Sequence, residues 1–497
     1  MNVNPITRLD YPDPDVIRVE DTYYMVSTTM HFMPGCEILQ SFDLVHWEHV
    51  TYVYETLDHT DAQQLKSGQN IYGQGMWAAS LRYHEGRFYI CFVANDTRKT
   101  YLYTSEKIDG PWKKQLIEGF YHDGSLLFDE DGRNYIVYGN DEIWITELNE
   151  DLTAPKKDGL HRLLVSDHKN PELGYEGSHI QKINGYYYIF LVHSLRDRWM
   201  RTEACFYSDS LEGEFTGGDV LCDDRGYCGQ GVAQGGIVDT PDGKWYAMLF
   251  QDSGAVGRIP ILLPVTWKDH FPFFGQNGHV PEEIEVHSTR PGYIYQPLVG
   301  SDDFCNGLLP RWQFNHDPDP RYYHLDALQG TYTITTREVC TELTQAVNTL
   351  TQRMSYPSCA AEVTVDASAL KEGDVAGLCA LQSCYAAVGI TKHHGKYEVL
   401  MLDKKEDGIL DMTEGTVVES HQMDFRLEAD FCNMKDEARC YYRVNKGDWL
   451  PIGTVHKLYF KLDHFTGCRF GLFCYAAEET GGSACFRDFK YYDCLLY

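Results

Sequence analysis

Five copies of one layout recur along the first half of the chain and constrain the fold more than any other feature. In each copy a leading residue stands 11 or 12 positions before a tyrosine, and a turn separates two short alternating runs. The leading residues are Asp13, Trp77, Asp123, Glu176 and Gln234. Asp-Gly or Asn-Gly between alternating runs is a strong β-hairpin signal. Copies at roughly 45–65-residue intervals are the size of one propeller blade. The sequence therefore predicts a five-bladed β-propeller.

A propeller gives these leading residues a shared location. The innermost strand of each blade starts near the central axis, so residues far apart in the sequence meet around one pocket. We expect the five leading side chains to converge there.

The repeats stop after Asp252, and alternating strands without a leading carboxylate continue to the end of the chain. Strands without a propeller period are typical of a two-sheet sandwich. We predict a propeller domain over 1–298 and a β-sandwich domain over 299–497. The fold class is therefore all-β, which agrees with 35 tyrosines and 23 phenylalanines.

Charge and composition restrict the partners and the compartment. A net charge of -30 argues against nucleic acid and anionic membranes as partners. No apolar run approaches the roughly 20 residues of a membrane span. The N-terminal residues show no secretion signal, and the 16 cysteines lack a paired zinc pattern, so we expect a cytoplasmic protein with mostly free thiols.

Three of the five leading residues are carboxylates: Asp13, Asp123 and Glu176. Alone, each is typical of a turn. Three acids gathered at one axis would repel one another, which favours a functional reason for their position. Such a cluster pushes pKa values apart, so that one acid can hold a proton while another is ionised. Glycoside hydrolysis needs that division of labour.

The residues around these acids resemble the blade motifs of glycoside hydrolase family 43. The matching segments are Tyr11-Pro12-Asp13-Pro14, Gly75-Met76-Trp77-Ala78, Asp123-Gly124-Ser125-Leu126 and Glu176-Gly177-Ser178-His179-Ile180. Asp302-Asp303-Phe304 and 348–353 are similar to the concanavalin-like, jelly-roll sandwich that follows the propeller in many members. The resemblance covers nearly the whole chain.

The resemblance implies a role for each residue. Asp13 matches the general base, Glu176 the general acid, and Asp123 the carboxylate that tunes and orients the acid. The remaining matches are expected to contact substrate: Trp77, Arg258, Phe32, Gln234 and His31. The implied activity is an inverting exo-glycosidase that removes terminal α-L-arabinofuranosyl or β-D-xylosyl residues from neutral plant cell-wall oligosaccharides of the xylan or arabinoxylan type.

Two positions differ from many relatives. Met30 occupies a slot that is often aromatic, with Phe32 two positions later, and Gln234 stands where many members place a histidine associated with a central ion or water. The residues therefore predict no metal ligands and no required cofactor. A structural calcium ion is left as an option that no motif supports.

Two alternatives remain at this stage. One is a non-catalytic carbohydrate-binding propeller, which the presence of all three carboxylates disfavours. The other is a retaining five-bladed glycosidase with Asp13 as nucleophile, in which the two carboxyl groups would lie roughly 5 Å apart rather than roughly 6.5–9.5 Å.

Overall fold

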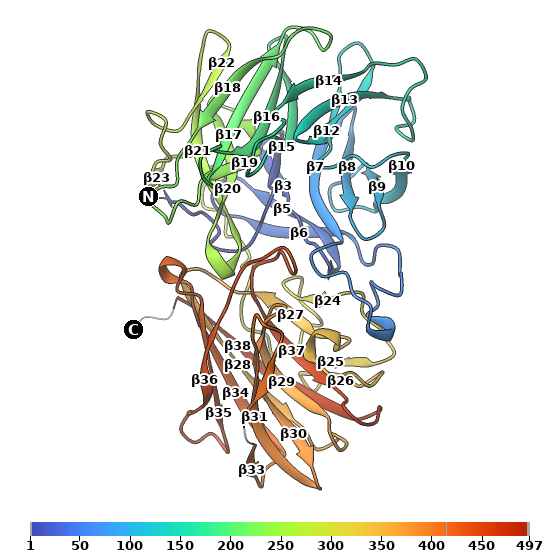
Figure 1. Ribbon diagram of the computed structural model, residues 1–497, viewed down its shortest axis with the longest axis vertical. Coiled ribbons are helices and arrows are strands. Elements are labelled where there is room, and N and C mark those ends of the chain that lie inside the picture. Colours follow the sequence, from blue (N-terminus) through green and yellow to red (C-terminus); the bar gives the residue numbers. More distant parts are fainter. Residues whose placement is uncertain (1, 414, 495–497) are drawn as a thin grey trace.

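A computed structural model describes residues 2–413 and 415–494 of the chain. Figure 1 shows two β domains one above the other, the propeller from the N-terminal part and the sandwich from the C-terminal part. The helical segments among the described residues are short 3-10 turns: η1 (Lys66–Gly68), η2 (Gly254–Val256), η3 (Leu343–Gln345) and η4 (Cys432–Met434). No helix in the described ranges is long and apolar enough to cross a membrane. The predicted all-β class is confirmed.

Five four-stranded antiparallel sheets form the blades. Blade one contains β2 (Asp15–Val19), β3 (Thr22–Val26), β5 (Gly35–Ser41) and β6 (Glu48–Tyr54). Blade two contains β7 (Met76–His84), β8 (Arg87–Ala94), β9 (Lys99–Ser105) and β10 (Lys113–Ile117). Blade three contains β11 (Ser125–Phe128), β12 (Asn134–Asn140), β13 (Glu142–Leu148) and β14 (His161–Ser166). Blade four contains β15 (Glu176–Ile183), β16 (Tyr186–Ser194), β17 (Arg201–Ser208) and β18 (Thr216–Leu221). Blade five contains β19 (Val232–Asp239), β20 (Trp245–Asp252), β21 (Arg258–Lys268) and β22 (Phe271–Phe274).

The hairpin signals in the sequence correspond to the turns between the first two strands of the blades. In blade four, Ile183 pairs with Tyr186 across the two-residue loop Asn184-Gly185. Both loop residues have positive φ, 51° and 85°. This backbone follows the twist of the strands, and asparagine and glycine adopt it at low cost.

The ring closes where the last blade meets the first. Strand β19 packs against β2, and β1 (Asn2–Val3) pairs with β23 (Glu283–Ile284), which follows blade five. Buried apolar side chains fill the space between these blades, among them Tyr23, Met248 and Leu262. Packing between neighbouring blades therefore holds the inner strands around a common axis.

Two sheets form the sandwich. The first has the order β32-β31-β30-β29-β37-β27-β24-β4, with β33 also paired to β31, and the second has the order β25-β26-β38-β28-β34-β35-β36. The strands of the first sheet are β4 (Phe32–Met33), β24 (Gln313–Asn315), β27 (Leu350–Arg353), β29 (Val375–Leu381), β30 (Ala386–His393), β31 (Lys396–Lys404), β32 (Leu410–Met412), β33 (Thr416–Val418) and β37 (Arg469–Tyr475). The strands of the second are β25 (Tyr323–Asp326), β26 (Thr331–Thr335), β28 (Ser358–Asp366), β34 (Gln422–Asp430), β35 (Glu437–Arg443), β36 (Leu450–Lys457) and β38 (Ser483–Asp493).

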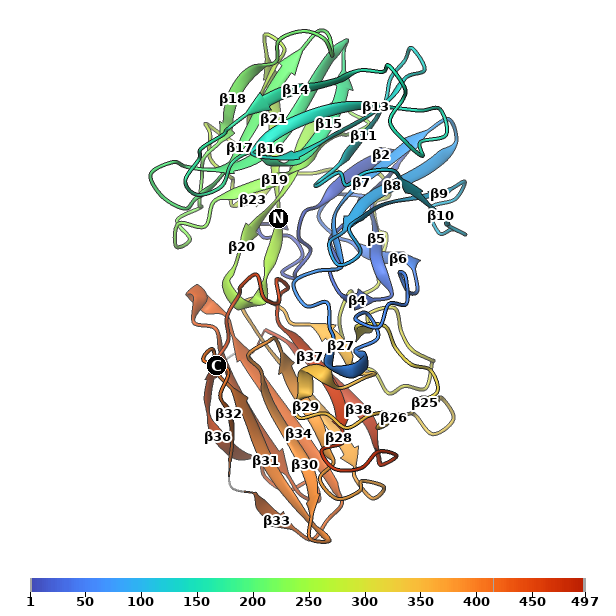
Figure 2. The same ribbon diagram turned by 45° about the vertical axis from the view of Figure 1, so that its right-hand side comes forward.

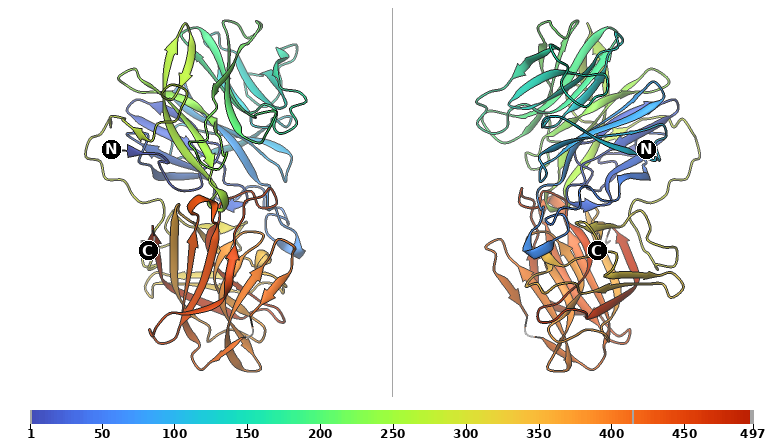
Figure 3. Two further views of the ribbon diagram at one scale, coloured as in Figure 1. Left: turned by 60° about the vertical axis from the view of Figure 1, so that its left-hand side comes forward. Right: turned by 90° about the vertical axis from the view of Figure 1, so that its right-hand side faces the viewer.

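The two domains are interlocked by strand β4. This strand lies between β3 and β5 of blade one in the sequence, yet it pairs with β24 and completes an edge of the first sandwich sheet. Figure 2 shows β4 where the propeller meets the sandwich. The chain leaves the propeller after β23 and reaches the sandwich at β24. Figure 3 shows this connection running along the outside of the propeller. The predicted boundary between 298 and 299 falls inside it.

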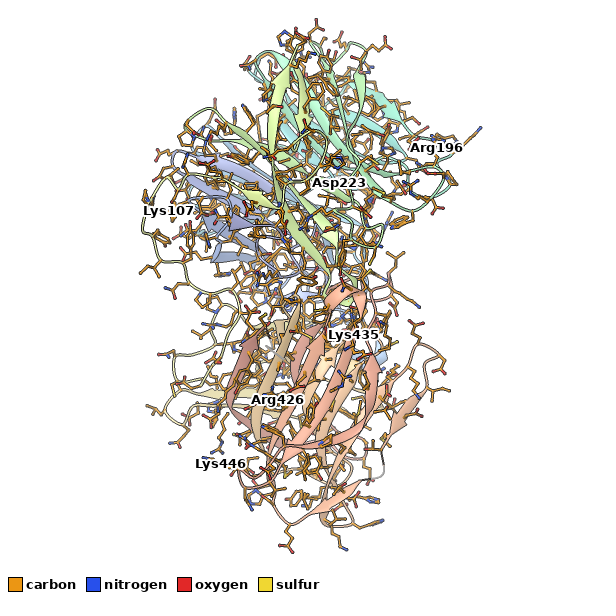
Figure 4. All side chains as sticks on the ribbon, turned by 90° about the vertical axis from the view of Figure 1, so that its left-hand side faces the viewer. Lys107, Arg196, Asp223, Arg426, Lys435 and Lys446 are labelled. Atoms are coloured by element: carbon orange, nitrogen blue, oxygen red, sulfur yellow. The ribbon has the colours of Figure 1, made fainter. Side chains whose placement is uncertain are left out.

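A buried ion pair reinforces the interface. Arg353 of β27 lies 2.9 Å from a carboxylate oxygen of Glu37 in β5, and both side chains are buried. The Arg353 guanidinium also covers the Tyr11 ring at 4.1 Å. Figure 4 shows side chains between the two domains, with Lys435 at the end of the sandwich next to the propeller. These contacts fix the sandwich against the end of the propeller where Asp13 lies.

Candidate active site

One cavity of about 560 Å³ lies at the propeller axis, on the side that faces the sandwich. All five leading residues of the sequence repeats line it: Asp13, Trp77, Asp123, Glu176 and Gln234. Arg258, the first residue of β21, lines it as well. The blades thus bring together six positions that the sequence placed in one site.

Local backbone geometry aims these side chains into the cavity. Asp13, Asp123 and Gln234 have positive φ values of 53°, 47° and 63°. In blade four the positive φ of 66° falls on Gly177, directly after Glu176. Strand pairing is shifted next to Trp77, Glu176 and Gln234, which marks a bulge in three blades. Bulges turn a side chain away from its regular direction and are common beside active sites.

Asp13 is buried, and two side chains donate hydrogen bonds to its carboxyl group. The Arg258 guanidinium lies 3.0 and 3.3 Å from its two oxygens. The Thr28 hydroxyl donates to Oδ2 at 2.5 Å. These hydrogen bonds fix the orientation of the Asp13 carboxyl group in the cavity, where a base can accept a proton from water.

Asp123 and Glu176 share a different environment, centred on His122. The His122 Nε2 atom lies 3.6 Å from Asp123 Oδ2 and 3.5 Å from Glu176 Oε2. Asp123 also accepts a hydrogen bond from the Gly177 amide at 3.0 Å. The Asn140 amide donates to Glu176 Oε2 at 2.7 Å. The two acids are therefore coupled through one imidazole.

The pKa values of this group are pushed apart. Burial raises the pKa of Asp123 to about 6, although the charge of His122 acts against it. Burial also opposes ionisation of Glu176, but the His122 ring beside it outweighs burial and lowers the Glu176 pKa. Burial lowers the His122 pKa, but the two carboxylates raise it to about 9. These shifts favour the charged form of His122 and favour a proton on Asp123 over one on Glu176.

The sandwich contributes one wall of the cavity. Phe460, Lys461, Leu462 and Phe465, which precede β37, line it together with Met434. The Phe465 ring lies 4.4 Å from the Arg258 guanidinium. A purely propeller-based site would lack this apolar wall, so the C-terminal domain forms part of the pocket.

His31 and Phe32 do not lie in the cavity. Phe32 is fully buried in the sandwich core beneath Arg469. His31 is fully buried among aromatic rings at the domain interface: Phe32, Tyr72, His316 and His464. The expected substrate contacts of these two residues do not agree with their positions, because β4 carries this segment away from the axis into the sandwich. Met30 lines the cavity in their place.

Several other cavity residues were not identified from the sequence. Three of them, Thr28, Asn140 and Asp252, lie at or just after the end of the second strand of a blade. A polar residue at this repeated position was a usable signal. His122 directly precedes Asp123, and Arg201, the first residue of β17, pairs with Asp252 at 2.9 Å.

One group of described residues could hold a metal ion. Ligand atoms of His122, Asp123 and Glu176 all lie within 4.8 Å of one another. One imidazole and two carboxylates suit a transition metal better than calcium, which prefers oxygen ligands only. This donor set therefore does not fit the structural calcium considered from the sequence.

Comparison with known proteins agrees with this architecture. The profile of glycosyl hydrolases family 43 matches residues 3–272, and that of the β-xylosidase C-terminal concanavalin A-like domain matches residues 301–492. Among solved structures, a bifunctional GH43-CE protein from Bacteroides eggerthii is 42% identical with a TM-score of 0.93. That similarity covers 100% of this chain and 64% of that one, so this chain spans under two thirds of its length.

Curated relatives carry two kinds of name. A β-xylosidase from Formosa agariphila is 26% identical over 97% of this chain and 88% of its own length. A non-reducing end α-L-arabinofuranosidase from Bacteroides ovatus is 24% identical over 82% of this chain and 79% of its own. Since the family profile matches more than half of the sequence, the chain belongs to glycoside hydrolase family 43.

Proposed function

We propose that the protein hydrolyses, in this cavity, the glycosidic bond that holds a terminal pentose on a neutral oligosaccharide. The pentose is released with inversion at its anomeric carbon. Asp13 serves as the general base and Glu176 as the general acid, while Asp123 tunes and orients Glu176. The observation that carries the proposal is the contrast between the acids. Asp13 accepts hydrogen bonds from Arg258 and Thr28, whereas Asp123 and Glu176 form a coupled pair around His122.

The reaction follows from these positions. Asp13 takes a proton from a water molecule, which attacks the anomeric carbon as the glycosidic bond breaks. Glu176 gives its proton to the leaving oxygen on the opposite face. The first proton that Asp123 and Glu176 bind belongs to the coupled pair and not to one residue alone. Within the pair, Glu176 keeps the more exposed side chain, 18% against 7% for Asp123, so it is the acid that a leaving group can reach. Water and side chains suffice, so the reaction needs no cofactor.

The shape of the site favours a terminal sugar. The cavity is walled on one side by Phe465 and Leu462 of the sandwich and on another by Trp77, an aromatic surface suited to a sugar ring. Relatives named β-xylosidase and α-L-arabinofuranosidase support terminal β-D-xylosyl or α-L-arabinofuranosyl groups, and plant xylan or arabinoxylan fragments carry both.

The test uses purified protein with aryl β-D-xyloside and aryl α-L-arabinofuranoside whose phenol leaving group is weakly acidic and so needs protonation. Asp13→Asn and Glu176→Gln keep the side-chain shape but remove the acid–base function, so each should lower kcat by about 10²–10⁴-fold. Asp131→Asn is the matched control, since Asp131 is an exposed turn residue of blade three. Full activity of both catalytic variants would overturn the proposal. Binding without turnover by the native protein would favour a carbohydrate-binding propeller.

A further inference from the structure

The two carboxylate oxygens of Glu176 lie in different surroundings. Oε2 accepts the Asn140 amide at 2.7 Å and lies 3.5 Å from His122 Nε2, an ion-pair distance rather than a hydrogen bond. Oε1 has no hydrogen-bond partner among residues 2–413 and 415–494. Protein donors therefore approach one oxygen and leave the other to the cavity.

Blade three positions both donors. His122 directly precedes Asp123 and β11, while Asn140 is the last residue of β12. The Gly139 amide donates to the His122 carbonyl at 3.0 Å, which ties the two segments together beside Glu176. The Trp77 ring lies edge-on to the imidazole at 5.6 Å and restricts its movement. The arrangement is fixed by backbone and packing, not by a flexible loop.

The chemistry of a carboxylic acid gives this asymmetry a consequence. An O–H bond on Oε2 would point at groups that are themselves donors, because an amide nitrogen and a charged imidazole offer hydrogen only. The proton is therefore favoured on Oε1. When it leaves, the negative charge spreads over both oxygens, and the contacts at Oε2 strengthen because charge-assisted hydrogen bonds are the strong ones.

We propose that His122 and Asn140 are positioning residues that keep the transferable proton of Glu176 on Oε1 and stabilise the carboxylate left behind. The inference rests on the proposed function, in which Glu176 is the general acid. In the step itself the Oε1–H bond breaks, the proton joins the glycosidic oxygen, and the bonding electrons stay on Glu176. The raised pKa of His122 supports its cationic form during this step.

The test compares His122→Gln and Asn140→Ala with the native protein on aryl glycosides whose leaving groups range from very acidic to weakly acidic phenols. Acidic phenols depart without protonation, whereas poor leaving groups need the acid. We expect both variants to lose about tenfold or more in kcat/KM on the poorest leaving group and much less on the best. Equal losses across the series would mean a structural role only and would overturn the inference.

A pH profile gives a second readout. The charged groups that face Glu176 are Asp123, His122, Arg201 and Arg258. Removing the His122 cation raises the pKa of Glu176, so the alkaline limb of kcat/KM should move to higher pH in His122→Gln and move less in Asn140→Ala. An unmoved limb in His122→Gln would contradict the inference.

Glu176→Gln separates the two levels of the argument. If this variant keeps full activity on poor leaving groups, the proposed function itself fails. If it loses that activity while His122→Gln and Asn140→Ala do not, only the positioning role fails.

Discussion

Acid should weaken the domain interface through one buried histidine. His464 lies in the sandwich segment that walls the cavity, and only 2% of its surface is exposed. Its ring packs on His31 at 5.1 Å and on Tyr72 at 5.2 Å. Burial, with a further contribution from the nearby charge of Arg469, lowers its pKa from 6.5 to about 3. The folded protein therefore resists protonation of this ring.

The sign and size of the effect follow from this shift. As the pH falls below about 6.5, the unfolded chain takes up a proton at His464 and the folded chain does not. The stability linked to His464 is therefore complete above about pH 6.5 and is lost as the pH falls towards 3. Each pH unit below about 6.5 lowers the free energy of unfolding by about 1.4 kcal/mol, so the loss at pH 5 is about 2 kcal/mol.

Urea unfolding of the native protein and His464→Gln, at about pH 7.5 and about pH 5, measures this effect. The free energy of unfolding of the variant, relative to that of the native protein, should rise by about 2 kcal/mol when the pH is lowered from about 7.5 to about 5. The reason is that glutamine at position 464 takes up no proton in the unfolded chain. Replacing the exposed His287 by glutamine is the matched control and should produce no such change. A relative stability of His464→Gln that is the same at both pH values would refute the reasoning.

Three further predictions concern the cavity and its supports. Gly177→Ala places a methyl group at φ 66° and 2.7 Å from a neighbouring side chain, so we expect a loss of about 1–2 kcal/mol in urea unfolding together with lower kcat. Asp10→Ala removes the acceptor of the buried Arg258 and Gly467 amides, which should cost about 1–3 kcal/mol per unpaired group and raise KM. Phe465→Ala removes the ring over the Arg258 guanidinium and one cavity wall. Steady-state kinetics should show a higher KM with little change in the melting temperature.

The sequence specified the propeller side of the site because its spacing is local. Each leading residue precedes its hairpin by a nearly constant number of positions, and residue pairs such as Asn184-Gly185 predict where the hairpin turns lie. The roles of Asp13 and Glu176 came from family resemblance, and only the structure shows that one is tied to Arg258 while the other faces an imidazole.

The features of the site that the sequence did not predict depend on contacts between distant parts of the chain. Strand β4 pairs with β24 about 280 positions later, and no local pattern predicts that Phe32 leaves the propeller for the sandwich. The Phe465 wall has the same origin, because it forms only when the domains dock. His122 was overlooked for another reason: a single histidine beside an acid has many structural uses, and its meaning here comes from the distance to Glu176.

The stereochemistry of the first product tests the central claim most directly. Proton NMR of an aryl β-D-xyloside or aryl α-L-arabinofuranoside reaction, recorded before the released sugar equilibrates, distinguishes its two anomers. Action of Asp13 on water and of Glu176 on the leaving oxygen predicts a product of inverted configuration. A product of retained configuration would mean that Asp13 attacks the sugar directly and would contradict the account.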